Sequence, residues 1–148
     1  MAGKLSAKDC GAIFQKKGRN GSSHYGIGYK DGEIGLYVDE CNTAWTDSNW
    51  NSNCKSVTIE TGDGQMGGDW KIGDKTMKSL IKLCADIAKR NKLGKLVKGK
   101  NLTNTRAAGS DHTVVLKRPR PITLEYCLDY INSDERILNL ESTKIEIS

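Results

Sequence analysis

The chain has 148 residues, 36% of them apolar, a net charge of +5 and a mean hydropathy of −0.56. These values fit one soluble domain of ordinary size with a modest core. The longest apolar stretches are only a few residues and the N-terminus lacks an apolar block, so the pattern excludes a membrane-spanning protein and predicts cytoplasmic synthesis without a signal peptide.

A short helix is predicted at the start of the chain. Ser6 followed by Asp9 resembles a capping pair, and Cys10, Ile13 and Phe14 form an apolar stripe. We expect this helix to end near residue 18, where a glycine follows two lysines.

A hairpin is predicted next, in the stretch SSHYGIGYKDGEIGLYVDE. Apolar residues alternate with small or polar ones over residues 25–29, and Asp31-Gly32 is a strong turn signal. Alternation resumes at Ile34, Leu36 and Val38, which predicts the second strand.

The following stretch, CNTAWTDSNWNSN, is rich in Asn, Ser and Asp, and we expect it to form a loop without regular structure. A short strand is predicted after it, in KSVTIETG. Val57 and Ile59 point to one face of this strand, and Ser56, Thr58 and Glu60 point to the other.

The longest predicted element is a helix from about Asp74 to Lys92. Its apolar residues recur at three- and four-residue spacing, so one side of the helix must be buried, and we expect it to pack on the sheet. These residues are Met77, Leu80, Ile81, Cys84, Ile87 and Ala88.

Positive charge concentrates beyond this helix. The stretch from Lys89 to Arg120 holds ten Lys or Arg and one acid, Asp111. Such a stretch suits nucleic acid, an anionic wall polymer or a membrane surface. No aromatic residue interleaves the charges, which favours a solvated basic surface instead.

The five cysteines are widely separated and odd in number, so no CxxC pair predicts a zinc knuckle and a disulfide framework would leave one thiol over. We expect reduced, buried cysteines, with Cys84 on the apolar side of the long helix. The five are Cys10, Cys41, Cys54, Cys84 and Cys127.

Six blocks of the chain read, in order, CGAIFQ, SSHYGIG, DGEIGLYVDE, NTAWTDSNWNSN, KSVTIET and SLIKLCADIAKRN. Blocks of this kind in this order resemble the zinc-dependent N-acetylmuramoyl-L-alanine amidases related to phage endolysins and peptidoglycan recognition proteins. The resemblance covers about Met1 to Thr103. It implies an α/β fold with a central mixed β-sheet flanked by helices, and bacterial peptidoglycan as the partner.

The resemblance also implies a chemistry. Members of the family hydrolyse the amide between N-acetylmuramic acid and L-alanine with one zinc ion, which polarises the carbonyl and activates a water molecule. A phage or prophage enzyme of this kind acts at the cell wall after release from the cytoplasm.

The resemblance assigns roles to several residues of this chain. Glu60 matches the position of the carboxylate that transfers protons, although an exposed residue at a strand end is the alternative. His24 lies in the block at the cleft, as a substrate-facing or a structural residue. The predicted muropeptide shelf, which could equally be a loop anchored by two tryptophans, consists of Trp45, Asn49, Trp50 and Asn53.

The zinc ligands depart from the family pattern. In relatives the first ligand comes from a His block that would lie just before Met1, so we expect the first strand to be missing and the domain to be truncated. The other histidine, His112, is the candidate metal ligand, with a surface residue as the alternative. We therefore predict weak or no zinc binding.

The end of the chain departs as well. Residues 1–103 are predicted to form a partial amidase-like domain, and residues 104–148 a divergent tail that a reading-frame shift or a replaced C-terminal segment would explain. Loss of the first strand would leave neighbouring backbone groups unpaired, unless the apolar pattern from Ile122 to Leu140 packs onto the gap.

Three functions remain open at this stage. The first is an amidase-family domain with an incomplete zinc site. The second is a peptidoglycan-binding module without catalysis. The third, less expected, is a basic protein that binds nucleic acid through Lys89 to Arg120.

Overall fold

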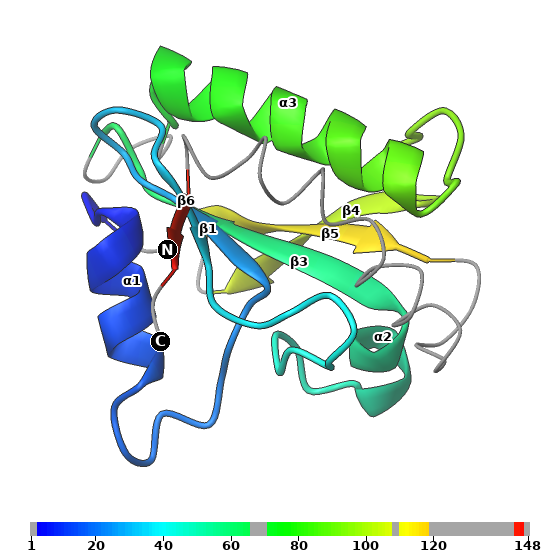
Figure 1. Ribbon diagram of the computed structural model, residues 1–148, viewed down its shortest axis with the longest axis horizontal. Coiled ribbons are helices and arrows are strands. Elements are labelled where there is room, and N and C mark those ends of the chain that lie inside the picture. Colours follow the sequence, from blue (N-terminus) through cyan, green and yellow to red (C-terminus); the bar gives the residue numbers. More distant parts are fainter. Residues whose placement is uncertain (1–2, 66–70, 108–109, 119–143, 147–148) are drawn as a thin grey trace.

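The computed structural model describes residues 3–65, 71–107, 110–118 and 144–146. Helices are interspersed among the strands along the chain, in keeping with an α/β fold (Figure 1). The elements are α1 (Ala7–Phe14), β1 (Tyr25–Ile27), β2 (Ile34–Leu36), α2 (Trp50–Cys54), β3 (Ser56–Thr61), α3 (Asp74–Arg90), β4 (Leu102–Ala107), β5 (Ser110–Lys117) and β6 (Lys144–Glu146).

The strands form one mixed sheet in the order β4-β5-β3-β1-β2-β6. β1 pairs antiparallel with β2 and parallel with β3, while β3 and β4 both pair antiparallel with β5. β6 pairs parallel with β2. The predicted α/β class with a mixed sheet is therefore confirmed.

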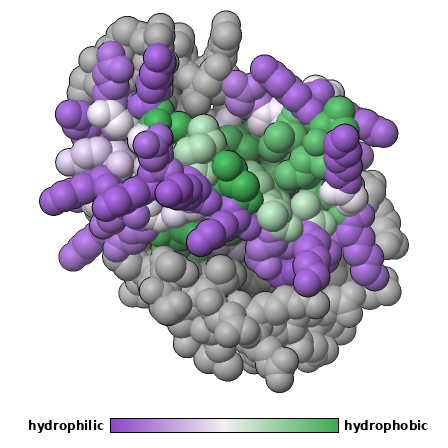
Figure 2. Space-filling model, turned by 90° about the horizontal axis from the view of Figure 1, so that it is seen from above, coloured by the Kyte–Doolittle hydropathy of each residue, from purple (hydrophilic) through white to green (hydrophobic). Residues whose placement is uncertain are grey.

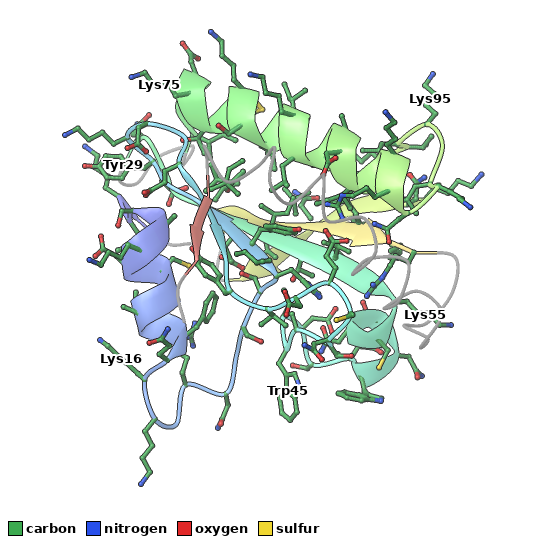
Figure 3. All side chains as sticks on the ribbon, in the orientation of Figure 1. Lys16, Tyr29, Trp45, Lys55, Lys75 and Lys95 are labelled. Carbon is green, nitrogen blue, oxygen red and sulfur yellow. The ribbon has the colours of Figure 1, made fainter. Side chains whose placement is uncertain are left out.

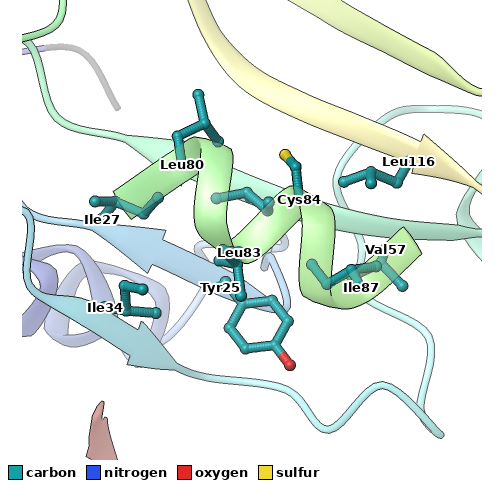
Figure 4. Close-up of a cluster of buried hydrophobic side chains, with 10 residues drawn as sticks. Tyr25, Ile27, Ile34, Val57, Leu80, Leu83, Cys84, Ile87 and Leu116 are labelled. Atoms are coloured by element: carbon teal, nitrogen blue, oxygen red, sulfur yellow. The ribbon is translucent and has the colours of Figure 1, made fainter. Parts of the chain in front are cut away.

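The core lies between α3 and one face of the sheet. Strand residues from β1, β3 and β5 meet leucine, isoleucine and cysteine side chains from the helix (Figure 4). The predicted long helix is confirmed, and its apolar face is confirmed in part. Leu80, Cys84, Ile87 and Ala88 are buried as expected, whereas Met77 and Ile81 are exposed. The buried helical residues are Thr76, Leu80, Leu83, Cys84, Ile87 and Ala88.

The glycines of the hairpin make room for one aromatic ring. A Cβ atom at Gly26 would lie 2.0 Å from Tyr37 Oη, and a Cβ at Gly35 would lie 2.8 Å from the same ring. The Tyr37 hydroxyl donates a hydrogen bond of 2.6 Å to the carbonyl oxygen of Ala7. The glycine spacing thus lets Tyr37 lie flat on the hairpin and hold α1 against it, on the sheet face opposite α3.

The first helix and the hairpin turn form as predicted. Asp9 N–H donates to Ser6 Oγ at 3.0 Å and Ser6 N–H donates to the Asp9 carboxylate at 3.3 Å, which completes a capping box. The Ser6 hydroxyl also donates to the Asp9 carboxylate at 2.6 Å, and this bond, together with the one from Ser6 N–H, holds the pKa of Asp9 below its usual range. Gly32 adopts a φ of 75°, and a Cβ there would lie 2.5 Å from the carbonyl oxygen of Lys75, so the turn requires glycine.

The predicted absence of regular structure in residues 41–53 is wrong in part, because this stretch contains most of α2. The Asn49 side chain caps the helix by accepting a hydrogen bond of 3.1 Å from Ser52 N–H. Asparagine and serine disfavour helix interiors but favour helix starts, so a composition that predicts a loop also permits one capped turn.

The segment predicted as a divergent tail supplies part of the sheet. The proposed boundary after Thr103 falls inside β4, and β5 pairs along the whole edge of β3 from Ser56 to Glu60. β3 is therefore paired on both sides by described residues. The predicted packing of Ile122 to Leu140 lies outside the described residues.

Four of the cysteines lie in described segments, and none of these four forms a disulfide. Cys10 and Cys84 are buried, whereas Cys41 and Cys54 are half-buried, so the prediction of buried thiols holds for two of these four. Burial raises the pKa of Cys10 to about 12 and that of Cys84 to about 11. Across the described segments, no helix has the length and apolar character needed to cross a membrane.

Candidate functional site

The candidate site lies on the sheet face opposite α3. Glu60 on β3 neighbours Gly26 on β1 and Thr113 on β5, so alternation points these positions away from the core residue Ile59. Trp45, in the loop before α2, lies on the same side of the molecule, well away from α3 (Figure 3). This face thus carries residues that are up to 68 positions apart in the sequence, from Trp45 to Thr113.

Glu60 is half-buried beside three polar groups. Its carboxylate accepts a hydrogen bond from the Thr113 hydroxyl. Cys10 and Tyr37 are close enough for its negative charge to raise the pKa of each, although burial is the larger cause for both. A carboxylate in this position can accept or hold a proton near a bound ligand, and the catalytic role of Glu60 stays a prediction.

Sequence reasoning missed Thr113 as the partner of Glu60. Thr113 lies in the stretch interpreted as divergent, and the two residues are separated by 53 positions. Only the antiparallel pairing of β3 with β5 joins them, and a single sequence carries no signal for that register.

His24 is fully buried rather than facing the solvent. Its Nδ1 accepts a hydrogen bond of 3.2 Å from Thr58 N–H, and its Nε2 donates to the carbonyl oxygen of Asn42 at 3.0 Å. Both ring nitrogens are therefore used inside the protein, in the neutral form of the ring. This environment supports the structural alternative, and the substrate-binding role of His24 stays a prediction.

Burial lowers the pKa of His24 from 6.5 to about 4. In the unfolded chain this histidine becomes protonated below pH 6.5, whereas in the folded chain it stays neutral down to about pH 4. The stability that is present above pH 6.5 is therefore lost as the pH falls from 6.5 to about 4. We expect the free energy of unfolding to fall by up to about 3 kcal/mol across this window. Urea titrations from pH 4 to 7 measure it. The His24→Gln variant, as the control, should lose this component of the slope, and an unchanged slope would contradict the assignment.

The two tryptophans of the loop are exposed. Trp45 and Trp50 each have 59% of their surface accessible, and their rings meet edge to face with centroids 6.2 Å apart. Two hydrogen bonds of 2.9 Å fix Trp45 beside Ser22: Ser22 N–H donates to the Trp45 carbonyl oxygen, and Trp45 N–H donates to the Ser22 hydroxyl. The indoles therefore form a small aromatic shelf on a held backbone; we call Trp45 and Trp50 the indole pair.

The asparagines of this loop serve the loop itself. Asn53 is buried, accepts hydrogen bonds of 3.3 and 3.2 Å from the N–H groups of Thr46 and Asp47, and donates one of 2.8 Å to the Asp47 carbonyl. Asn49 caps α2. These carboxamides shape the shelf, and direct contact of either with a ligand stays a prediction.

The predicted metal ligand is His112. This residue is on β5, but its side chain lies outside the described residues. Within the described parts of the chain, no three His, Cys, Asp or Glu side chains come together in a group that could hold a metal ion. Burial also raises the pKa of Cys10, which lies near Glu60, so this thiol disfavours the thiolate form that binds metals. Zinc needs three or four deprotonated ligands, so the described side chains alone do not make up such a site, and weak or no zinc binding stays a prediction.

Comparison with known proteins defines the class. Residues 2–115 match the family model for N-acetylmuramoyl-L-alanine amidase, so the chain belongs to this amidase family. A mixed α/β sheet with a candidate carboxylate on one face is in keeping with that membership. No solved structure matches the chain.

A second resemblance covers the end of the chain. Residues 88–147 match the model for the TypA/BipA C-terminal domain. The large ribosomal subunit assembly factor BipA of Buchnera aphidicola is 51% identical over 39 residues, which are 26% of this chain and 6% of that protein. The BipA of Escherichia coli K12 is 47% identical over 49 residues, 33% of this chain and 8% of that protein. The chain thus matches less than a tenth of the length of these relatives.

Proposed function

We propose that this amidase-family domain recognises bacterial peptidoglycan on the face that carries Glu60 and the indole pair. The single observation that carries the proposal is the exposure of two adjacent indoles on a backbone fixed by hydrogen bonds. Indole faces stack against the C–H groups of sugars, and large exposed aromatic groups on a held loop are typical of a binding surface. The family match supplies the polymer that this surface would meet.

The proposed role of the surrounding polar groups is to hold the shelf. Asn53 and Asn49 form hydrogen bonds within the loop and at the start of α2, so the backbone that carries the indoles is already ordered. The indoles can therefore contact a ligand with little further loss of backbone entropy on binding. Glu60 would then lie beside the bound stem peptide, where its carboxylate can accept a hydrogen bond from a peptide N–H.

Cleavage of the amide between N-acetylmuramic acid and L-alanine is the second candidate function, favoured by the position of Glu60 beside Thr113. In that case Glu60 would move the proton, and the zinc ion expected for the family would supply the activated water. Because the described side chains do not fit that ion, we propose recognition without cleavage for this chain, with weak or no zinc binding.

Clearing of a purified peptidoglycan suspension separates the two functions. Recognition alone predicts sedimentation of the protein with the wall and no fall in turbidity, with or without added zinc. A fall in turbidity that a chelator abolishes would overturn recognition without cleavage and establish the amidase.

The indole pair gives the sharper test of binding. We expect Trp50→Ala to weaken co-sedimentation with peptidoglycan about tenfold, because an aromatic contact at the centre of a site contributes on the order of 1.4 kcal/mol or more. Ile81→Ala is the matched control, since Ile81 is equally exposed but lies on α3, across the sheet. Equal binding by the two variants would contradict the proposed shelf.

The basic stretch raises the question of another polymer. Retention on nucleic acid falls steeply with salt, whereas stacking on sugar does not. We propose that binding to the cell wall persists as the salt concentration rises. We also propose that the protein reaches the wall after release from the cytoplasm. Loss of wall binding between 50 and 200 mM salt, on the order of a thousandfold, would instead indicate binding to phosphate.

A further inference from the structure

A groove lies on the other side of the sheet, between α3 and the edge of the sheet formed by β4. Its volume is about 1040 Å³. Seen from above, apolar side chains gather in a hollow bordered by hydrophilic ones (Figure 2). Its apolar lining includes Met77, Leu80, Ile81, Leu96, Leu102 and Val114.

Two features show that the groove is unfilled by the described chain. Ile81 is 60% exposed and Met77 is 41% exposed, although both are on the helix face that carries the core residues. β4 pairs with β5 alone among the described strands, so it forms an edge of the sheet beside the groove. Exposed apolar surface bordered by polar residues is typical of an interaction site.

The charge of the lining identifies the kind of partner. Three lysines line the groove, Lys89, Lys92 and Lys98, and no acidic residue does so among the described residues. A second copy of the chain would bring the same positive charges face to face, which disfavours a symmetric dimer here. An occupant with an apolar face and acidic flanks would contact the apolar side chains of the groove and also neutralise the lysines that border it.

The dimensions favour a helix as that occupant. The groove follows α3 from Met77 to Lys92, which is about 22 Å or four helical turns. Half the volume of a four-turn helix about 11 Å across is on the order of 1000 Å³. A helix half sunk in the groove therefore fills it, whereas one narrow acyl chain would leave much of it in contact with water.

We propose that this groove binds an acidic amphipathic α-helix of a partner protein, with the helix's apolar stripe on Ile81 and Met77 and its carboxylates beside Lys89 and Lys98. This site is separate from the peptidoglycan face, because the two lie on opposite faces of the sheet. Failure of one assignment leaves the other standing.

The experiment uses the full chain and three fluorescently labelled synthetic peptides of about 18 residues. The first carries leucines on one helical face and glutamates on the other. The second has the same composition with the leucines scattered, and the third has lysine in place of glutamate. Fluorescence anisotropy should show binding of the first peptide at least about tenfold tighter than of either control.

Variants of the protein locate the site. Ile81→Asp should weaken binding of the first peptide about tenfold or more, because it removes apolar contact and adds a charge of the wrong sign. The double change Lys89→Glu with Lys98→Glu should weaken it more than Lys78→Glu with Lys82→Glu, which alters net charge equally on α3 residues that do not line the groove.

Circular dichroism melts confirm that each variant is folded, which is expected because the substituted residues are exposed. Equal affinity for the three peptides, or binding insensitive to both Ile81→Asp and the Lys89/Lys98 change, overturns the proposal. Binding of sodium oleate that Ile81→Asp abolishes, without binding of the acidic peptide, overturns it in favour of a lipid.

Discussion

Replacing Arg90 by alanine is expected to lower the free energy of unfolding by about 3–5 kcal/mol, because it leaves the Glu40 carboxylate buried without its counter-charge. Arg90 Nη2 lies 2.7 Å from Glu40 Oε1, and the two side chains are 7% and 0% exposed. Tyr25 and Asn91 donate to the same carboxylate at 2.6 and 3.3 Å. Urea denaturation measures the change.

Two variants control this result. Asp86→Ala removes the half-exposed partner of Arg90, at 2.7 Å, and should cost less than about 1 kcal/mol. The double variant Glu40→Gln with Arg90→Met should lose less free energy of unfolding than the two single variants lose in sum. Each single change leaves one buried charge without its partner, whereas the double change removes both charges. Additive costs, or an Arg90→Ala loss below about 1 kcal/mol, would show that the pair does not stabilise the protein.

Replacing Ile87 by alanine is expected to cost about 2–5 kcal/mol, because the change leaves a cavity between α3 and the sheet. Ile87 is fully buried in the core that Figure 4 shows. The same substitution at Ile81, on the same helix but 60% exposed, should change the stability by no more than about 0.5 kcal/mol. Thermal and urea unfolding measure both, and equal losses would mean that α3 is packed in another orientation.

These two predictions concern the parts of the chain that hold the proposed sites. Glu40 follows the hairpin, and Arg90 ends α3, so their ion pair joins the loop that leads to Trp45 with the helix that forms the groove. Arg118 adds a third segment by donating to the Glu40 carbonyl oxygen at 2.9 Å. The contacts of Glu40 therefore connect the segments that carry the proposed peptidoglycan face and the groove.

The two family resemblances meet in the β4–β5 hairpin. Residues 88–115 fall within both matched ranges, and they include β4 and the part of β5 that carries Thr113. β5 completes the sheet beside β3 and supplies the hydrogen bond to Glu60. The amidase match covers most of the chain, whereas the TypA/BipA match covers its last two fifths, and no block of the sequence suggested the second resemblance.

The local patterns of the chain were sufficient for several elements. The Ser6 and Asp9 pair, the Asp31-Gly32 turn and the helical spacing around Ile87 each depend on residues within a few positions of one another. Neighbouring residues specify such features through capping, turn geometry and amphipathic periodicity, and no distant contact is needed to predict them. The amidase resemblance likewise followed from the order of local blocks.

The tertiary structure alone decided the rest. The pairing of β3 with β5, the burial of His24 and the contact of Glu60 with Thr113 each join residues from distant segments. The sequence also could not show that Asn53 serves its own loop while the indoles stay exposed, or that Ile81 borders an open groove. Side-chain type limits what a residue can do, but strand register and helix placement determine which groups it meets, and those depend on packing across the whole chain.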